Sequence, residues 1–133
     1  MSPKNRYADA MLELLLDEHI APDVAAGLRR RHPQLVVHCL VDWEGGNFLG
    51  QDDSSCLLEA AFQRLTLVTY DRRTIPPLLK TWTEEGVQHL GVIFVDEKTI
   101  SPNDIGGLVK GLSQIYLQLR ECDWTDRVCF LRK

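Results

Sequence analysis

Five short apolar runs, separated by segments of helix length, constrain the fold of this chain more than any other feature. The runs are rich in Leu, Val and Ile, and they cover residues 12–16, 35–41, 65–69, 90–95 and, more weakly, 127–131. Strands that are covered on both faces of a parallel sheet have such nearly continuous apolar sequences. Strands that alternate with helices imply βαβ units. We therefore expect an α/β fold, a three-layer αβα sandwich around a mainly parallel sheet of four to five strands.

The segments between these runs carry helix start and stop signals. We expect helices over residues 22–32, 52–64, 75–85 and 101–121. Pro22 lies in the first turn of the first helix, where its missing N–H costs little, and three arginines close that helix, where cations suit the helix dipole. Asp52 and Asp53 can cap the start of the second helix, and Gly86 is the expected C-cap of the third.

Length and charge limit the classes of protein that the chain can represent. At 133 residues it has the length of one domain, which we expect to span residues 1–133 with a frayed polar segment at residues 1–10. The net charge of -4 argues against a protein that grips duplex nucleic acid over a broad surface. No apolar run approaches the roughly 20 residues of a membrane span, so no membrane partner is expected.

The four cysteines are Cys39, Cys56, Cys122 and Cys129, and none of them forms a Cys-x-x-Cys pair. This spacing argues against a zinc ribbon and against a thioredoxin-like site. Cys39 and Cys56 stand in apolar runs and are interpreted as small buried side chains. A reduced, cytoplasmic location is the simplest prediction.

Acidic residues follow the ends of several predicted strands. In an open parallel sheet, binding sites lie at the carboxyl ends of the strands. Asp17 and Glu18 follow the first strand, Asp71 follows the third and Asp96 follows the fourth. The second helix, which should begin at the same rim, opens with an acidic pair that includes Asp53. Segments that are distant in sequence are therefore predicted to bring carboxylates to one rim of the sheet.

A cluster of carboxylates has a chemical consequence. The carboxylates repel one another, and a folded protein tolerates the cluster mainly when a cation neutralises it. Oxygen ligands on rigid elements, with room for water, suit Mg²⁺ or Mn²⁺. Such an ion polarises a phosphoryl oxygen and activates a water, so the expected reaction is phosphodiester hydrolysis. The candidate ligands from position alone are Asp17 and Asp71 after their strands, one acid of the Asp52-Asp53 pair and, from strand geometry, Asp96.

Three segments of the chain resemble the PIN-like family of short prokaryotic proteins. They are Leu14-Leu15-Leu16-Asp17-Glu18-His19, Asp53-x-x-Cys56-Leu57-x-x-Ala60 and Leu67-Val68-Thr69-Tyr70-Asp71-Arg72. The match covers roughly residues 12–96 in order and spacing, and the first and third segments together make it specific. The resemblance implies a PIN-like fold and a Mg²⁺- or Mn²⁺-dependent ribonuclease. Many members are toxins that a small antitoxin neutralises.

The resemblance identifies Asp17, Asp53 and Asp71 as the catalytic acids that bind the metal ion. In the mechanism that we expect, Glu18 orients a water or a ligand, and Arg72 steadies the substrate phosphate, since Arg suits phosphate contacts. A toxin role further implies an RNA substrate, a small antitoxin partner and a homodimeric nuclease. The chain departs from the family in having Arg73 where many relatives carry a further Asp, so the site can hold one metal ion where others hold two.

Other interpretations stay open from the sequence alone. A phosphorelay receiver also has an acid pair after its first strand and an Asp after its third, but this chain has no Lys-Pro pair, and Val95 passes directly to Asp96. A catalytically inert PIN-like binding or regulatory module is a second alternative, which the acidic charge favours. Each acid also has a structural interpretation: the Asp52-Asp53 pair is what helix capping alone would produce, so Asp52 remains the alternative to Asp53.

Overall fold

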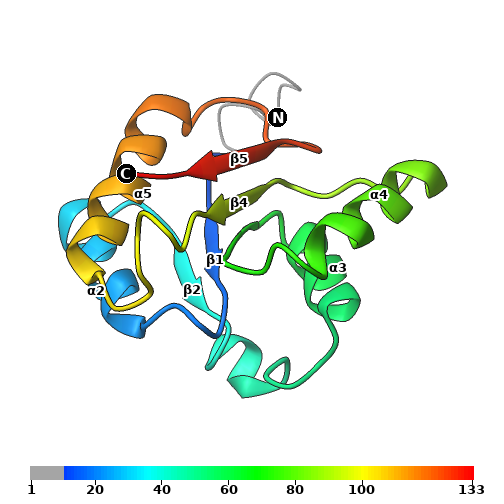
Figure 1. Ribbon diagram of the computed structural model, residues 1–133, viewed down its shortest axis with the longest axis horizontal. Helices are drawn as coiled ribbons and strands as arrows, with labels where there is room; N and C mark the ends of the chain where they lie inside the picture. The colour runs from blue at the N-terminus through cyan, green and yellow to red at the C-terminus, as the bar shows by residue number, and fades with distance from the viewer. Residues whose placement is uncertain (1–10) are drawn as a thin grey trace, which may run out of the picture.

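The structure, a computed structural model, describes residues 11–133, so the expectation for residues 1–10 lies outside the described part. Its elements are β1 (Leu14–Leu16), α2 (Pro22–Arg31), β2 (Val37–Cys39), η1 (Trp43–Gly46), α3 (Asp53–Phe62), β3 (Thr66–Thr69), α4 (Ile75–Glu85), β4 (Val92–Val95), α5 (Ile105–Leu119) and β5 (Val128–Leu131) (Figure 1). Every predicted strand and helix is present. Each strand is shorter than its apolar run, because end residues such as Leu12 and Leu35 are buried without belonging to a strand.

The strands form one sheet in the order β2-β1-β3-β4-β5. All four neighbouring pairs are parallel. Leu15 of β1 stands between His38 of β2 and Leu67 of β3, and β4 continues the sheet with Leu67 opposite Val92. The α/β prediction with a mainly parallel sheet is thus confirmed, and the sheet has five strands.

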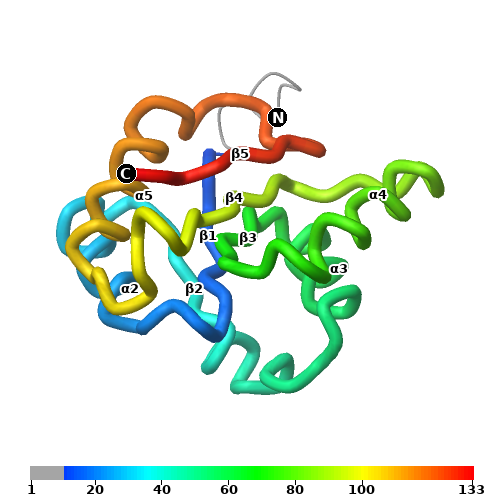
Figure 2. Tube along the Cα trace, in the orientation of Figure 1, coloured from blue at the N-terminus to red at the C-terminus, as the bar shows by residue number. Residues whose placement is uncertain are grey.

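Helices cover both faces of this sheet. α2 and α5 lie together on one face and α3 and α4 on the other, as the ribbon and the chain trace both show (Figures 1 and 2). Alternate residues of a strand point to opposite faces. Accordingly, Leu14 and Leu16 join the core beneath α2 and α5, while Leu15 joins the core beneath α3 and α4. The predicted three-layer αβα sandwich is confirmed.

The last connection, β4–α5–β5, has the opposite hand to the other three. The chain moves in the same direction along the sheet from β2 to β3, from β3 to β4 and from β4 to β5. α3 and α4 accompany the first two moves on one face, whereas α5 packs beside α2 on the other. Connections between parallel strands are nearly always right-handed. The reversal leaves the α3/α4 face of β5 without the helix that a connection of the usual hand would place there.

Local signals explain most of the helix boundaries. Asp52 caps α3 by accepting a hydrogen bond from the Ser55 N–H at 2.8 Å, and Gly86 ends α4 with a φ of 73°. α5 begins at Ile105, later than the predicted residue 101, because Asp104 rather than Ser101 caps it. Within residues 11–133, no helix combines the length and the apolar character that crossing a membrane requires.

Candidate functional site

The sheet has a switch point between β1 and β3. From β1 the chain moves outward to β2, and after α3 it returns to the other side of β1 as β3. Open α/β sheets bind ligands outside the carboxyl ends of their strands at such a point. Asp17 directly follows β1, its N–H donates to the Val68 carbonyl of β3 at 2.9 Å, and Asp71 follows β3. Two of the predicted acids therefore lie at the switch point.

The Asp17 carboxylate is held by two hydrogen bonds. Its Oδ1 accepts from the Glu18 N–H at 2.6 Å, and its Oδ2 accepts from the Thr69 hydroxyl at 2.6 Å. Thr69 is fully buried, and its Oγ1 in turn accepts from the Asp71 N–H at 3.0 Å. One hydroxyl thus links the side chain of the first acid to the backbone of the third, which fixes the rotamer of the half-buried Asp17.

A second hydroxyl joins the carboxylates of Asp53 and Asp71. Thr74 Oγ1 lies 2.6 Å from Asp53 Oδ2 and is also in hydrogen-bonding contact with Asp71 Oδ2. The Asp71 Oδ1 atom accepts from the N–H groups of Arg73 and Thr74, both at 2.9 Å. A threonine hydroxyl carries a single proton, so it can donate to one of the two carboxylates at a time. The other carboxylate oxygen is left facing the hydroxyl oxygen with no proton between them.

Electrostatics at Asp71 favour its charged form. Burial alone would raise the pKa of this carboxyl, but the hydrogen bonds from Thr74 and from the Arg73 N–H, together with the Arg73 charge, lower the pKa below its usual value. Hydrogen bonds to a carboxylate stabilise the ionised form in this way. Asp71 is therefore a carboxylate at neutral pH.

The thiol of Cys56 responds to the gathered acids. Its pKa is raised to about 11, mainly by burial and further by the negative charges of Asp53, Asp17, Asp52 and Glu18. Negative charges near a thiol disfavour the thiolate. Cys56 lies in the first turns of α3, so the carboxylates that follow β1 and those that open α3 act on one point near the switch point.

The two acids that open α3 have different roles. Asp52 is the N-cap, and its hydrogen bonds from Ser55 lower the pKa of its carboxyl. Asp53 is the first residue of the helix and reaches Thr74 instead. Of the two acids between which the sequence left the choice open, Asp53 is the one that joins the hydrogen-bond network at the switch point.

The side chains of the other three predicted site residues make no hydrogen bond to this network among the described residues. The Asp96 carboxylate accepts from the Lys98 N–H at 3.0 Å and closes a turn after β4, with no hydrogen bond to the network among the described residues. The guanidinium carbon of Arg72 lies 5.4 Å from the centre of the Phe130 ring. Glu18 is exposed beside Asp17, to which it is joined by its backbone N–H.

The residues present can be tested for their fit to a divalent metal ion. Within residues 11–133, no group of three His, Cys, Asp or Glu side chains is arranged to hold one metal ion. Mg²⁺ commonly binds one or two carboxylates and keeps several waters. Asp53 and Asp71 supply two carboxylates and Thr74 a neutral oxygen between them. A cation there would compensate the carboxylate oxygen that the single Thr74 proton cannot serve, so these residues fit a hard divalent ion.

The sequence reasoning missed Thr69 and Thr74. Threonine at the end of a buried strand or before a helix is ordinary, so neither residue carries a strong signal by itself. The spacing Asp71-x-x-Thr74 was the available signal, because Asp side chains often accept hydrogen bonds from backbone groups two and three residues further on. The arrangement at Asp71 follows this pattern.

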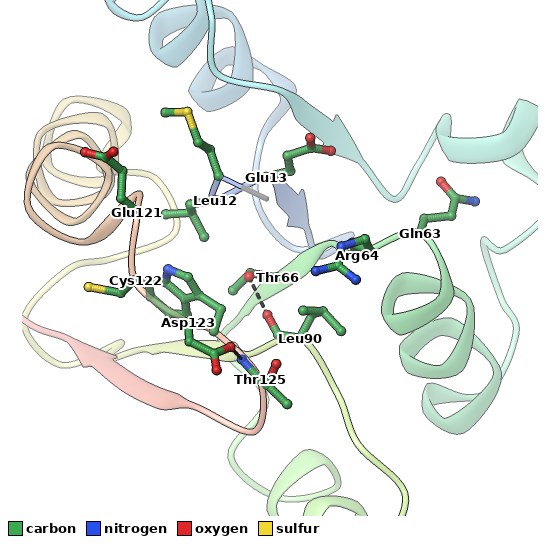
Figure 3. A pocket seen from close by; sticks show the side chains of 12 residues that line it. Leu12, Glu13, Gln63, Arg64, Thr66, Leu90, Glu121, Cys122, Asp123 and Thr125 are labelled. Carbon is green, nitrogen blue, oxygen red and sulfur yellow. Dashed lines mark hydrogen bonds between the residues drawn. The ribbon is translucent and has the colours of Figure 1, made fainter. Parts of the chain in front are cut away.

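A cavity of about 140 Å³ lies at the opposite, amino-terminal edge of the sheet (Figure 3). Its wall contains Thr66, whose hydroxyl donates to the Leu90 carbonyl at 2.6 Å, and Asp123, which accepts from the Thr125 N–H at 2.9 Å. No predicted site residue lines this cavity. It is therefore separate from the acidic rim at the switch point.

No protein-family model, no curated protein and no solved structure matches the chain. The candidate site is accordingly defined by its own geometry: Asp17 and Thr69 on one side, and Asp53, Thr74 and Asp71 on the other, at the carboxyl ends of β1 and β3.

Proposed function

We propose that the chain is a Mg²⁺- or Mn²⁺-dependent endoribonuclease of the PIN type, which hydrolyses RNA phosphodiester bonds at the rim between β1 and β3. The observation that carries the proposal is the meeting of the Asp53 and Asp71 carboxylates on the Thr74 hydroxyl, at the switch point where such sheets bind ligands. A divalent ion held by these residues would supply neutralising charge and would polarise a phosphoryl oxygen.

The acids divide the remaining work between them. Asp53 and Asp71 would hold the ion, and the Thr74 hydroxyl keeps their two carboxylates close together. Asp17, fixed by the Thr69 hydroxyl and the Glu18 N–H, accepts a proton from the water that attacks the phosphate. The P–O bond to the leaving ribose oxygen breaks, and that oxygen takes a proton from solvent. The exposed carboxylate of Glu18 orients the attacking water. A fixed rotamer supports this role for Asp17, because a general base acts only from within hydrogen-bonding distance of the proton that it removes.

An arginine next to Asp71 binds the substrate phosphate in this proposal. Arg72, the residue expected from the sequence, must leave the Phe130 ring to do so. Arg73 already acts on the charge of Asp71 and is exposed at the same turn, so it reaches a phosphate at the rim without that rearrangement. Both arginines offer the paired donors that phosphate oxygens accept.

One observation favours a second candidate, a phosphorelay receiver. The strand order 2-1-3-4-5 occurs in receiver domains, with the functional acids at the same switch point. A receiver requires a lysine from the segment after its fifth strand at the acidic site. Lys133, the lysine that follows β5, instead contacts Asp104 at the start of α5, with 3.3 Å between Nζ and Oδ2. The ribonuclease therefore remains the better-supported proposal.

The family resemblance extends the proposal to partners and location. An RNA substrate, a small antitoxin that covers the acidic rim and a cytoplasmic location belong together in a toxin–antitoxin toxin. All four cysteines are free, and Cys39, Cys56 and Cys129 lie in β2, α3 and β5. Free thiols suit a reducing compartment. The catalytically inert module is the alternative that the following experiment separates from the nuclease.

The test is Mn²⁺-dependent cleavage of a mixed, end-labelled RNA by the wild-type chain and by matched variants. Asp53→Asn and Asp71→Asn remove the proposed ligands and are expected to reduce cleavage by about a hundredfold or more. Asp52→Asn is the control, because Asn caps a helix as well as Asp does and Asp52 does not join the network. Chelation of the metal is expected to stop cleavage by the wild-type chain.

Two outcomes would overturn the proposal. Equal cleavage by the wild-type chain, Asp53→Asn and Asp71→Asn would place the activity at another site or in a contaminant. No cleavage by any of them, with a melting temperature that still rises with Mn²⁺ only when Asp53 and Asp71 are intact, would establish the inert module.

A further inference from the structure

The edge strand β5 exposes apolar side chains on one face. Val128 and Phe130 are 42% and 52% exposed, whereas Leu131 is buried and Cys129 packs against the α2/α5 core. The Phe130 ring stacks at 5.7 Å on that of Phe94, which belongs to the α3/α4 core. Val128 and Phe130 therefore share the α3/α4 face of the sheet, the face that the reversed hand of the β4–α5–β5 connection leaves without a helix over β5.

Among residues 11–133, no backbone hydrogen bond reaches the outer side of β5, so within this part of the chain the strand is also open toward the outside of the sheet. The carbonyl of Arg127 accepts a hydrogen bond from the N–H of Val92 in β4 at 3.0 Å, and the carbonyl of Leu131 accepts one from Asp96, directly after β4, at 2.8 Å. Along a parallel strand, every second residue directs its backbone N–H and C=O groups toward the same neighbouring strand. Cys129 lies between Arg127 and Leu131 in this alternation, so its backbone groups also face β4. The N–H and C=O groups of Val128 and Phe130 consequently point away from the sheet. A free edge of this kind is a template for pairing with another strand.

The opposite edge of the sheet differs from this one. At β2, the guanidinium of Arg29 donates a hydrogen bond to the Val37 carbonyl. A charged side chain at a strand edge discourages pairing with a second strand. Of the two edges, β5 is the one that combines outward backbone groups with an exposed apolar strip.

We infer that β5 is the homodimer interface of this protein, in which the β5 strands of two copies pair antiparallel about a two-fold axis through Cys129. In this register Val128 of each copy stands opposite Phe130 of the other. Both are residues with outward backbone groups, so each pair exchanges two hydrogen bonds. An exposed β-branched side chain then faces an exposed aromatic one, which is a favourable cross-strand pair. The inference does not depend on the proposed nuclease activity.

Charge complementarity indicates that a second copy of this chain pairs with the β5 edge. In the same register, the turn before β5 brings Asp126, whose Oδ1 also accepts from the His89 N–H at 3.1 Å, to the end of the interface where the partner copy's Arg132 follows its strand. The two-fold axis repeats this pair of opposite charges at the other end. The Asp126 side chain is 52% exposed and Arg132 is exposed. A shift of the register by two residues in one direction would place Phe130 opposite Asp126, and a shift in the other direction would place Val128 opposite Arg132. In both cases an apolar side chain would face a charged residue outside the strand. The self-paired register thus matches backbone, apolar and charged groups together.

In this register, a disulfide bond between the two copies can report the pairing of the β5 strands. Cys129 of one copy stands opposite Cys129 of the other as a non-hydrogen-bonded pair, at which the Cα atoms are about 4.5 Å apart. That separation lies within the range of a disulfide. Oxidation by diamide should therefore form one bond between the two sulfurs, with two electrons and two protons passing to the reagent. Cys122 lies outside β5 and provides the matched control.

The test measures molar mass by light scattering over a wide concentration range, and cross-linking by diamide. The wild-type chain is expected to be a dimer that diamide cross-links. Cys122→Ser should keep the cross-link and Cys129→Ser should lose it. Val128→Pro removes an outward N–H while leaving the bonds to β4 intact, as proline at a sheet edge can. We expect it to weaken dimerisation at least about tenfold with little change in melting temperature.

Two further variants guard against ambiguous results. If Val128→Pro lowers the melting temperature strongly, Phe130→Lys tests the same surface without a backbone change and is expected to give a monomer. Phe62→Ser removes another exposed apolar side chain, on α3, and should leave the dimer intact. A monomer at all concentrations, a dimer that Phe62→Ser but neither β5 variant dissociates, or a dimer without the Cys129 cross-link would each overturn the inference.

Discussion

The hydroxyl oxygen of Thr74 lies 2.6 Å from Oδ2 of Asp53, although one residue precedes α4 and the other opens α3. The contact brings the amino-terminal ends of these two helices together at the carboxyl end of the sheet. Because the same hydroxyl also contacts Asp71, the two carboxylates are held close to each other in spite of their charge. A site of this kind is expected to respond to cations.

A first prediction concerns metal binding. A ligand that binds the folded state alone stabilises it by about 1.4 kcal/mol at ten times its dissociation constant. We expect Mg²⁺ or Mn²⁺ to raise the melting temperature of the wild-type chain by a few degrees, and chelation to reverse the shift. Asp53→Asn should remove the response and Asp52→Asn should retain it. Scanning calorimetry checks this, and an equal shift in Asp53→Asn would place the ion elsewhere.

A second prediction concerns the Thr74 hydroxyl. Thr74→Val keeps the shape of the side chain but removes its hydrogen bond to a carboxylate, which typically contributes about 1 kcal/mol to stability. We expect a loss of that size in urea denaturation and a weaker response to Mn²⁺. Thr74→Ser retains the hydroxyl and should behave as the wild-type chain does. A Val variant with an unchanged Mn²⁺ response would exclude Thr74 from the ion site.

A third prediction concerns pH and His89. This side chain is buried, and burial lowers its pKa more than the nearby Asp126 charge raises it. Its Nδ1 accepts a hydrogen bond from the Gly91 N–H at 3.0 Å, so the folded state holds it neutral. The unfolded chain takes up the proton near pH 6.5, so stability is complete above that pH and falls as the pH drops toward the lower folded-state pKa.

Denaturation midpoints measured on either side of pH 6.5 check this dependence. His89→Gln should flatten the decline, even if the variant is less stable at neutral pH. His19→Gln, at an exposed position, is the control and should retain the decline. A decline of the same size in His89→Gln would assign the pH dependence to other groups.

A fourth prediction uses two glycines as a matched pair. Gly91 has a φ of 100°, and a Cβ added there would lie 2.8 Å from a ring carbon of Trp124. Gly91→Ala is therefore expected to destabilise the fold by about 3 kcal/mol, from backbone strain and overpacking. Gly106 lies in α5 with open space around it, so Gly106→Ala should stabilise by about 0.5–1 kcal/mol. Urea denaturation of both variants tests the pair.

Much of the fold could be predicted because burial dominates this sequence. The apolar runs that form β1, β3 and β4 are fully covered, so their composition alone indicates strands of a parallel sheet. The position of α5 could not be predicted in the same way. An apolar helix face shows that a helix is buried but does not say against which face of the sheet, so the reversed hand of its connection appears only in three dimensions.

The candidate site was predictable to the extent that strand ends and helix starts fix positions. Asp17 and Asp71 were identified because each follows a strand at the carboxyl rim, and Asp53 because it opens a helix there and matches the family resemblance. The structure brings all three into one network with two threonines. Asp96 leaves β4 at the same rim, but its carboxylate closes a local turn. Sequence position shows where an element ends but not where a side chain points. The sequence therefore could not show that Asp96 differs from the three acids of the network.

The packing of α5 against α2 also bears on how the protein folds. A Cβ added to Gly27 of α2 would lie 2.8 Å from a methyl carbon of Val109 in α5, so the first and last of the described helices are in close contact. Contacts between segments so distant along the chain form late and slow the folding reaction. The part of α2 that packs on α5 stays uncovered until α5 has been synthesised and docked, although α2 also packs on the sheet. Backbone amides of the two helices should therefore exchange with solvent in one cooperative opening, as a single unit that spans nearly the whole sequence.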